Sequence, residues 1–158
     1  MENITPFLWF DHQAEEAVQF YTSVFKDSSI SRIVHYGKNA PMPEGSVMTI
    51  GFSLNGQQFT ALNGGPVFSF TPAVSFVVNC ADQEEIDLLW KGLSEHGTIL
   101  QCGWLTDKYG VTWQIVPAKL PLLLDETDPE RYNRVTAALL KMVKLEIAPL
   151  ENAFNNLS

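Results

Sequence analysis

The sequence predicts an α+β fold of two βαβββ modules whose curved sheets form a cleft, followed by C-terminal helices. The main observation is a repeat, because the segment that starts at Ala14 recurs from Gln83, 69 positions later. In both copies an acidic pair precedes apolar residues spaced i, i+3, i+4 and i+7, which is typical of a helix with one buried face. A hairpin signal at Asn55-Gly56 and a Gly- and Pro-rich connection near Gly65 support the same division. A duplicated unit also predicts a site where its two copies meet.

The first module is expected to span residues 1–66. Its predicted elements are a strand from Ile4 to Phe10, a helix from Asp11 to about Phe25, and strands from Ile30 to Tyr36, Ser46 to Leu54 and Gln57 to Asn63. Asp11 is the expected N-cap of the helix. The third strand alternates apolar and small or polar residues, as a strand with one buried face does. Asn55-Gly56 then suits a type I′ turn, which needs positive φ at both central residues.

The second module is expected to span residues 67–117 and to repeat this order. Its predicted elements are a strand from Ala73 to Cys80, a helix from Asp82 to His96, and strands from Thr98 to Cys102, Trp104 to Asp107 and Val111 to Val116. Gly97 is the expected left-handed residue that ends the helix. The repeat offset of 69 also aligns Phe7 of the first module with Phe76 of the second.

Residues 118–158 belong to neither repeat and are expected to form a helical tail. Asp128-Pro129 is a strong helix start, with Asp as the cap and Pro in the first turn. Val135, Ala138 and Met142 then share an apolar stripe, and Pro149 begins a last short helix. We expect the tail to cover a sheet face or a neighbouring subunit, and the whole chain to form one structural domain.

The composition limits the partners that this protein can have. The chain of 158 residues has a formal net charge of -8, which disfavours nucleic acid and anionic membrane surfaces as partners. No apolar run reaches the roughly 20 residues that span a bilayer. Met1-Glu2-Asn3 has neither the basic nor the apolar region of a secretory signal, so we expect a cytoplasmic protein with reduced Cys80 and Cys102.

Several motifs that carry chemistry are missing from the sequence. His12, His35 and His96 form no metal-binding spacing and are expected on the surface or in loops. Neither cysteine has a neighbouring basic residue in the sequence that would activate it, so both are expected to be small buried residues rather than nucleophiles. Gly64-Gly65 lacks the spacing of a nucleotide-binding loop and is interpreted as a linker between modules.

Aromatic residues are concentrated in the predicted strands. Trp9, Trp104 and Trp113 are either ordinary core residues or part of a cavity wall that binds flat apolar molecules. The sequence leaves both readings open. A site for a charged metabolite would instead show converging Arg or Lys, and these strands carry few basic residues.

Several motifs resemble those of the PhnB-like family, which carries the name 3-demethylubiquinone-9 3-methyltransferase. The matching segments lie at residues 4–11, 61–66, 78–80, 102–117 and 140–144. This family is part of the vicinal oxygen chelate superfamily, with glyoxalase I, bleomycin-resistance proteins and extradiol dioxygenases. The resemblance covers nearly the whole chain and implies a homodimer with a cleft formed by eight strands.

The resemblance also implies where a metal would bind. Metal enzymes of the superfamily place His, Glu or Gln ligands on the first and fourth strand of each module. The corresponding positions here are Thr5, Thr60, Ser75 and Gln114. Two threonines, a serine and a glutamine are weak neutral ligands, whereas a divalent ion needs carboxylate or imidazole groups. We therefore expect neither a metal nor another cofactor.

Three hypotheses for function follow. The preferred one is a protein that binds a small apolar or aromatic molecule through the expected ligand-binding residues Thr5, Trp9, Thr60, Ser75, Trp104, Trp113 and Gln114. The second is an enzyme, either a methyltransferase that fits the family name or a metal-dependent lyase or isomerase, whose catalytic residues the sequence does not identify. The third is a structural protein whose cleft is filled by its own side chains.

Overall fold

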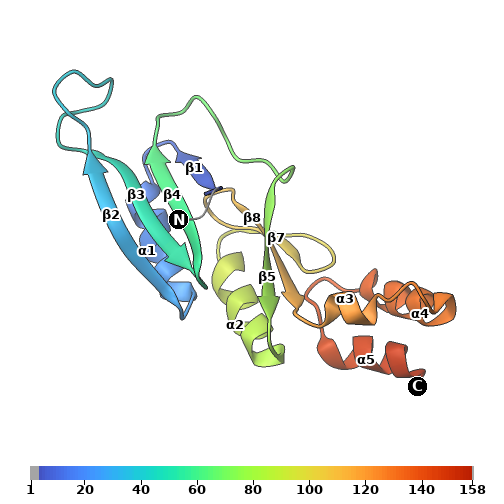
Figure 1. Ribbon diagram of the computed structural model, residues 1–158. Coiled ribbons are helices and arrows are strands. Elements are labelled where there is room, and N and C mark those ends of the chain that lie inside the picture. The colour runs from blue at the N-terminus through green and yellow to red at the C-terminus, as the bar shows by residue number, and fades with distance from the viewer. Residues whose placement is uncertain (1–3, 158) are drawn as a thin grey trace. The chain divides into compact units, whose positions relative to one another are not determined.

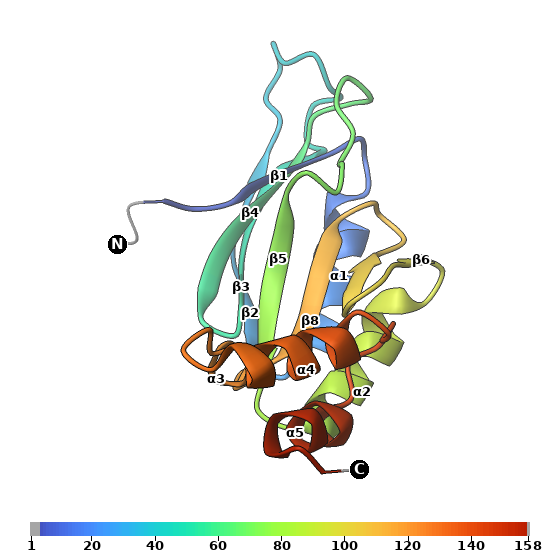
Figure 2. The same ribbon diagram turned by 90° about the vertical axis from the view of Figure 1, so that its right-hand side faces the viewer.

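The computed structural model describes residues 4–157 (Figures 1 and 2). Met1-Glu2-Asn3, on which the expectation about a secretory signal rests, lies outside these residues. The chain divides into two compact units, one up to Phe70 and one from Thr71 onward. Each unit contains a four-stranded sheet and a helix, and the second also carries the C-terminal helices. The predicted α+β fold with two sheet modules and a helical tail is therefore confirmed.

The first unit holds a mixed sheet. Its elements are β1 (Phe7–Phe10), α1 (Ala14–Val24), β2 (Ser28–His35), β3 (Val47–Leu54) and β4 (Gln57–Asn63). The strand order is β1-β4-β3-β2, in which β1 runs parallel to β4 and the other neighbours are antiparallel. Helix α1 covers one face of the sheet (Figure 1).

Alternation along the strands builds the core of this unit. Ile50, Phe52 and Leu54 of β3 are buried, while the residues between them are only half-buried. Phe52 stacks between the rings of Tyr21 on α1 and Phe59 on β4. Asn55 and Gly56 have φ values of 47° and 82°, so the predicted hairpin with two left-handed residues is confirmed.

The prediction that Asp11 caps the first helix is wrong. Helix α1 begins at Ala14, and Gln13 at the N-cap makes no side-chain capping bond. Instead, the Asn63 side chain accepts a hydrogen bond from the Ala14 N–H at 2.8 Å. Asn63 pairs with Phe10 in the parallel β1–β4 ladder, so the end of β4 lies beside the point where the chain turns into α1.

The second unit repeats the arrangement with shorter strands. Its elements are β5 (Ser75–Cys80), α2 (Gln83–Ser94), β6 (Thr98–Ile99), β7 (Trp104–Thr106) and β8 (Thr112–Pro117). The strand order is β5-β8-β7-β6, with β5 parallel to β8, and α2 packs on one face. Asp82 caps α2 by accepting a hydrogen bond from the Glu85 N–H at 2.9 Å.

The predicted alignment of Phe7 with Phe76 is wrong by one residue. Phe7 pairs with Thr60, whereas Phe76 pairs with Trp113 and contacts its ring on the α2 side of the sheet. Counted back from Phe10 and Cys80, the last residues of β1 and β5, the counterpart of Phe7 is Val77, which pairs with Gln114. The first strands of the modules therefore align at an offset of 70 positions, while the helices keep the offset of 69. A shift of one residue matters because it exchanges the two faces of a strand.

Two details at the second helix and third strand also differ from the predictions. Helix α2 ends at Ser94, and His96 rather than Gly97 takes the positive φ, at 59°. Gly97 is needed for close packing, because a Cβ there would lie 2.3 Å from the Thr106 carbonyl oxygen. Strand β6 ends at Ile99 and not at Cys102, because Cys102 and Gly103 both have positive φ and form a corner.

The tail is a small helical cluster attached to the second module. It contains α3 (Leu120–Leu123), which the sequence analysis did not predict, α4 (Pro129–Leu139) and α5 (Ile147–Asn155). Leu123, Val135 and Leu150 form its buried centre. Asp128 caps α4 by accepting a hydrogen bond from the Arg131 N–H, so the predicted helix start is confirmed.

Candidate functional site

The face of the second sheet that points away from α2 carries three of the predicted site residues. Gln114 pairs with Trp104 across β7–β8 and with Val77 across β5–β8, so their side chains share this face. Gln114 Nε2 donates a hydrogen bond to Ser75 Oγ at 2.9 Å. The structure thus brings Ser75, Trp104 and Gln114 together, and all three are half-buried.

The polar groups of this face are neutral. Thr106 and Thr112 share a hydroxyl–hydroxyl hydrogen bond of 3.2 Å beside Gln114. Within residues 4–157, Gln114 Oε1 accepts no hydrogen bond. This oxygen is free to accept a hydrogen bond from an O–H or N–H group, and Trp104 offers an aromatic surface beside it. A neutral ligand with a flat apolar body and one donor group matches these features.

The corresponding face of the first sheet is built from smaller groups. Thr60 pairs with both Phe7 and Gly51, and it is half-buried on the face away from α1. Thr5 lies two residues before β1 and is exposed. Thr60 and Gln114 occupy equivalent ladder positions in their sheets, because their partners Phe7 and Val77 each lie three residues before the end of β1 and β5.

Trp9 lies on the same side as Thr60 but is held by the segment that follows β4. Its Nε1–H donates to the Gly65 carbonyl oxygen at 2.9 Å, and the Phe68 ring meets the indole edge-on at 5.0 Å. A Cβ at Gly64 would lie 2.4 Å from the Trp9 ring. The Trp9 ring therefore packs directly on Gly64 and bonds to Gly65, which explains these glycines without a phosphate ligand.

Trp113 lies on the opposite face from Gln114. It is 2% exposed, contacts Phe76 and donates a hydrogen bond from Nε1 to Asp107 Oδ2 at 2.8 Å. Asp107, which the sequence analysis did not single out, also accepts hydrogen bonds from the Tyr109 and Val111 N–H groups. The signal for it was the spacing Asp107 to Gly110, because an Asp three residues before a Gly often organises a turn. Asp107 fixes the β7–β8 hairpin and, through it, the register of Gln114.

The two cysteines differ in exposure, because Cys80 is buried as predicted, whereas Cys102 is half-buried and the prediction of burial is wrong for it. Burial, followed by the charges of Glu85 and Asp82, raises the pKa of the Cys80 thiol to about 12, which disfavours the nucleophilic thiolate. Among residues 4–157 no three His, Cys, Asp or Glu side chains gather in a way that suits a metal ion. In the same part of the chain, no helix has the length and hydrophobicity to cross a bilayer.

The comparisons with known proteins identify the family. The model of the family described as 3-demethylubiquinone-9 3-methyltransferase matches residues 2–116. The chain belongs to this family. A PhnB protein from Bacillus cereus is 43% identical, with a TM-score of 0.68, over 74% of this chain and 100% of that one. No match was found among the curated proteins.

More distant solved structures share the fold alone. A protein from Pseudomonas aeruginosa is 20% identical, with a TM-score of 0.62, over 74% of this chain and 98% of that one. The fosfomycin resistance protein FosX from Listeria monocytogenes, solved with Mn(II) and sulfate, is 12% identical, with a TM-score of 0.53, over 81% of this chain and all of that one. These likenesses show that the fold extends to proteins of low sequence identity.

Proposed function

We propose that this protein binds a small, neutral, flat molecule on the face of the second sheet that carries Trp104 and Gln114. The hydrogen-bonded Gln114–Ser75 pair beside the Trp104 ring is the observation that carries the proposal. Because the Gln114 amide is half-buried and its oxygen accepts no hydrogen bond from the described residues, a ligand O–H or N–H that donates to this oxygen would be favourable. In the first unit, the equivalent candidates are Thr60 and Trp9 on the sheet and Thr5 just before β1.

The site chemistry supports a function without a bound metal. The fold family includes a Mn(II) protein. Here the four positions that correspond to metal ligands hold only hydroxyl and amide groups, at Thr5, Thr60, Ser75 and Gln114. The Gln114 side chain donates a hydrogen bond to the Ser75 hydroxyl, so these two groups already contact each other. These ligands do not offset the dehydration of a divalent ion. The residues present therefore do not fit a metal, and the proposal contains no metal-assisted step.

Tryptophan quenching tests the proposal. We expect 2-methyl-1,4-naphthoquinone or a related neutral aromatic molecule to quench the fluorescence in a saturable way. Gln114→Leu should weaken binding about tenfold, because it removes a partly buried hydrogen bond to the ligand. Gln19→Leu makes the same change on the exposed side of α1 and should bind normally. Absence of saturable quenching across a panel of quinones and aromatic metabolites would refute the proposal.

A second candidate function is the methyl transfer that the family name describes. Family membership favours it, because the match spans residues 2–116. Against it, the glycine pair that most resembles a cofactor loop is occupied by Trp9. Incubation with S-adenosylmethionine and a demethylated quinone, followed by mass spectrometry, decides the matter, since a methylated product would establish the transferase.

We further propose that the protein forms a homodimer in the cytoplasm. Edge strand β2 exposes Ile30 and Ile33, and β1 exposes Phe7, which are large apolar side chains to leave in water. Both cysteines are free thiols, as is usual in a reducing compartment. Light scattering at micromolar concentration should give twice the chain mass of 17.7 kDa, and a monomer would contradict the dimer.

A further inference from the structure

Residues 142–147 of the tail, here called the strap, run beside the corner that precedes β7. The Cys102 N–H donates to the Met142 carbonyl oxygen at 3.0 Å, and the Gly103 N–H donates to the Val143 carbonyl oxygen at 2.7 Å. Cys102 has a φ of 57°, a conformation that residues other than glycine rarely adopt. A backbone held in that region needs support from its surroundings, and the strap supplies it.

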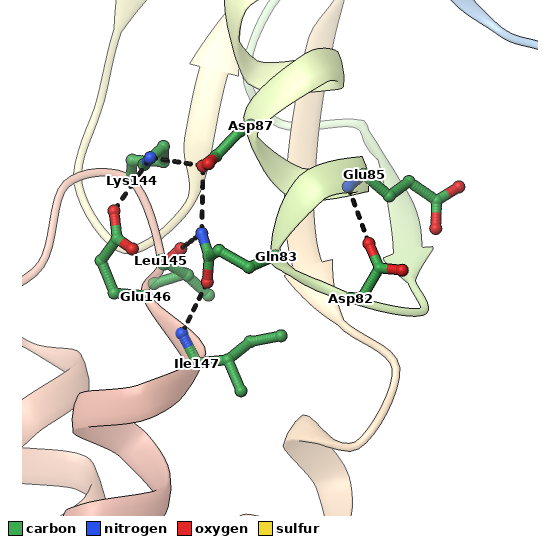
Figure 3. Close-up of polar contacts among 8 residues, drawn as sticks. All are labelled: Asp82, Gln83, Glu85, Asp87, Lys144, Leu145, Glu146 and Ile147. Atoms are coloured by element: carbon green, nitrogen blue, oxygen red, sulfur yellow. Dashed lines mark hydrogen bonds and ion pairs between the residues drawn. The ribbon is translucent and has the colours of Figure 1, made fainter.

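Gln83 at the start of α2 holds the strap in place (Figure 3). Its Oε1 accepts a hydrogen bond from the Ile147 N–H at 2.8 Å, and its Nε2 donates to the Leu145 carbonyl oxygen at 3.1 Å. One side chain thus satisfies two backbone groups of the strap, as a neighbouring strand would. Figure 3 also shows Lys144 between Asp87 and Glu146, with which it forms ion pairs.

Side-chain packing also joins the strap to the corner. Leu145 is fully buried, and a Cβ on Gly103 would lie 3.0 Å from its Cγ. The Gly103 carbonyl oxygen accepts a hydrogen bond from the Ile115 N–H at 2.8 Å, so Gly103 lies between the strap and β8. Trp104, the next residue, begins β7 and pairs with Gln114.

The strap lies beyond the residues that the family model matches, although it overlaps the segment 140–144 whose sequence resembles the family. That match ends at residue 116, and the strap begins 26 positions later. The corner at Cys102 and Gly103 lies within the matched residues, and a segment beyond them supports it. The strap is therefore connected through the corner to Trp104 on the site face.

We infer that the strap positions Trp104, so that docking of the tail and ligand binding on the second sheet stabilise each other. The inference rests on the proposed function for its ligand, while its structural part stands on the corner geometry. Two coupled equilibria of this kind are reciprocal: a ligand that needs the ordered corner also favours the docked strap. Gln83 and Lys144 act as positioning residues and touch no ligand.

The first test needs no ligand. The chain has four tryptophans, so 5-fluorotryptophan labelling gives four fluorine resonances, and Trp104→Phe identifies the one of interest. Gln83→Leu and Lys144→Met should shift or broaden the Trp104 resonance. They should also speed amide exchange in peptides that contain Cys102 and Gly103, by roughly tenfold for the first variant and twofold to fivefold for the second.

Two matched variants separate positioning from a general loss of stability. Lys119→Met removes an ion pair with Glu151 that lies wholly within the tail, and it should leave the Trp104 resonance unchanged. Lys144→Arg keeps the charge and should restore the parent spectrum. An unchanged Trp104 resonance in both Gln83→Leu and Lys144→Met, or an equal effect from Lys119→Met, would overturn the inference.

The second test measures coupling with 2-methyl-1,4-naphthoquinone as the probe. Gln83→Leu should weaken its binding about threefold or more, although Gln83 is not on the site face, and Lys119→Met should not. Normal affinity in Gln83→Leu, despite faster exchange at the corner, would refute the coupling. If the parent protein binds no probe, the proposed function fails, and the fluorine and exchange measurements alone decide whether the strap positions Trp104.

Discussion

The two modules start their helices in different ways. Helix α2 is capped by Asp82, the residue directly before it, whereas α1 depends on Asn63 from the end of β4. The Asn63 side chain also donates hydrogen bonds to Glu15 and to the Val47 carbonyl oxygen. The first helix therefore requires a formed sheet, while the second has its signal in its own sequence. The difference teaches that equivalent elements in a duplicated fold need not be stabilised by equivalent residues.

The largest expected effect comes from Asn63→Ala. This change leaves the Ala14 N–H and the Val47 carbonyl oxygen without their buried partner, so we expect a loss of about 3 kcal/mol in the free energy of unfolding. Urea denaturation measures it. Asn79→Ala, at an exposed position of β5, should change stability by less than about 0.5 kcal/mol. Equal effects from the two variants would show that Asn63 has no special role.

The next largest effect is expected at Trp9, which packs on a glycine in the first module. Gly64→Ala places a methyl group 2.4 Å from the Trp9 ring, and we expect a loss of about 2 kcal/mol together with a changed Trp9 emission. Gly37→Ala has open space around its new Cβ and serves as the control. Unchanged stability and emission in Gly64→Ala would mean that Trp9 is not seated on this glycine.

Asp82→Ala sharpens the comparison of caps. Loss of a local N-cap should cost about 1 kcal/mol, clearly less than the loss of Asn63. Thermal unfolding of both variants under one set of conditions gives the ranking. If Asp82→Ala proves more harmful than Asn63→Ala, the account of two unlike helix starts is wrong.

The smallest effect concerns pH and the contact of the tail with α2. Hydrogen bonds from Lys144 and Gln83 lower the pKa of Asp87 from 3.8, and bonds to Asp87 and Glu146 raise the pKa of Lys144 from 10.5. The interactions of the Asp87 carboxylate stabilise the fold above about pH 4, and this stabilisation is lost as the pH falls through the lowered pKa. The interactions of the Lys144 ammonium group stabilise the fold below about pH 10, and this stabilisation is lost as the pH rises through the raised pKa.

Comparison of the parent with Lys144→Met across this range checks the pH dependence. The difference in stability should be constant near neutral pH, shrink at both extremes, and fall when salt is added. Lys119→Met provides the control, because its ion pair with Glu151 joins two residues of the tail and includes no charged residue of α2. A stability difference that is independent of pH and salt would contradict the electrostatic role of Lys144.

Local signals were readable in the sequence, and long-range partners were not. Asn55-Gly56 and Asp128-Pro129 determine backbone geometry at their own positions, so the hairpin and the helix start were predictable. The side chains of Asn63 and Gln83 accept hydrogen bonds from backbone groups 49 and 64 positions away, and no local sequence pattern predicts such contacts.

The candidate site shows the same division. Ser75 and Gln114 lie on the first and fourth strands of the second module, a placement that follows from the duplication, while their role in binding stays a prediction. The sequence analysis grouped Trp113 with Gln114, although adjacent residues of a strand point to opposite faces. Both faces of β8 carry apolar residues, so the sequence does not show which face packs against the helix. The alternation from the buried Trp113 to the half-buried Gln114 becomes visible only once α2 is seen to cover one face.

The central claim is that the face carrying Trp104 and Gln114 binds a neutral aromatic molecule. Titration of the fluorotryptophan-labelled protein with 2-methyl-1,4-naphthoquinone tests it most directly, because the four tryptophans lie in different environments. We expect a saturable shift of the Trp104 resonance, lost in Gln114→Leu, with the buried Trp90 and Trp113 resonances unchanged. A Trp104 resonance that stays fixed while the resonance of Trp90 or Trp113 moves would contradict it.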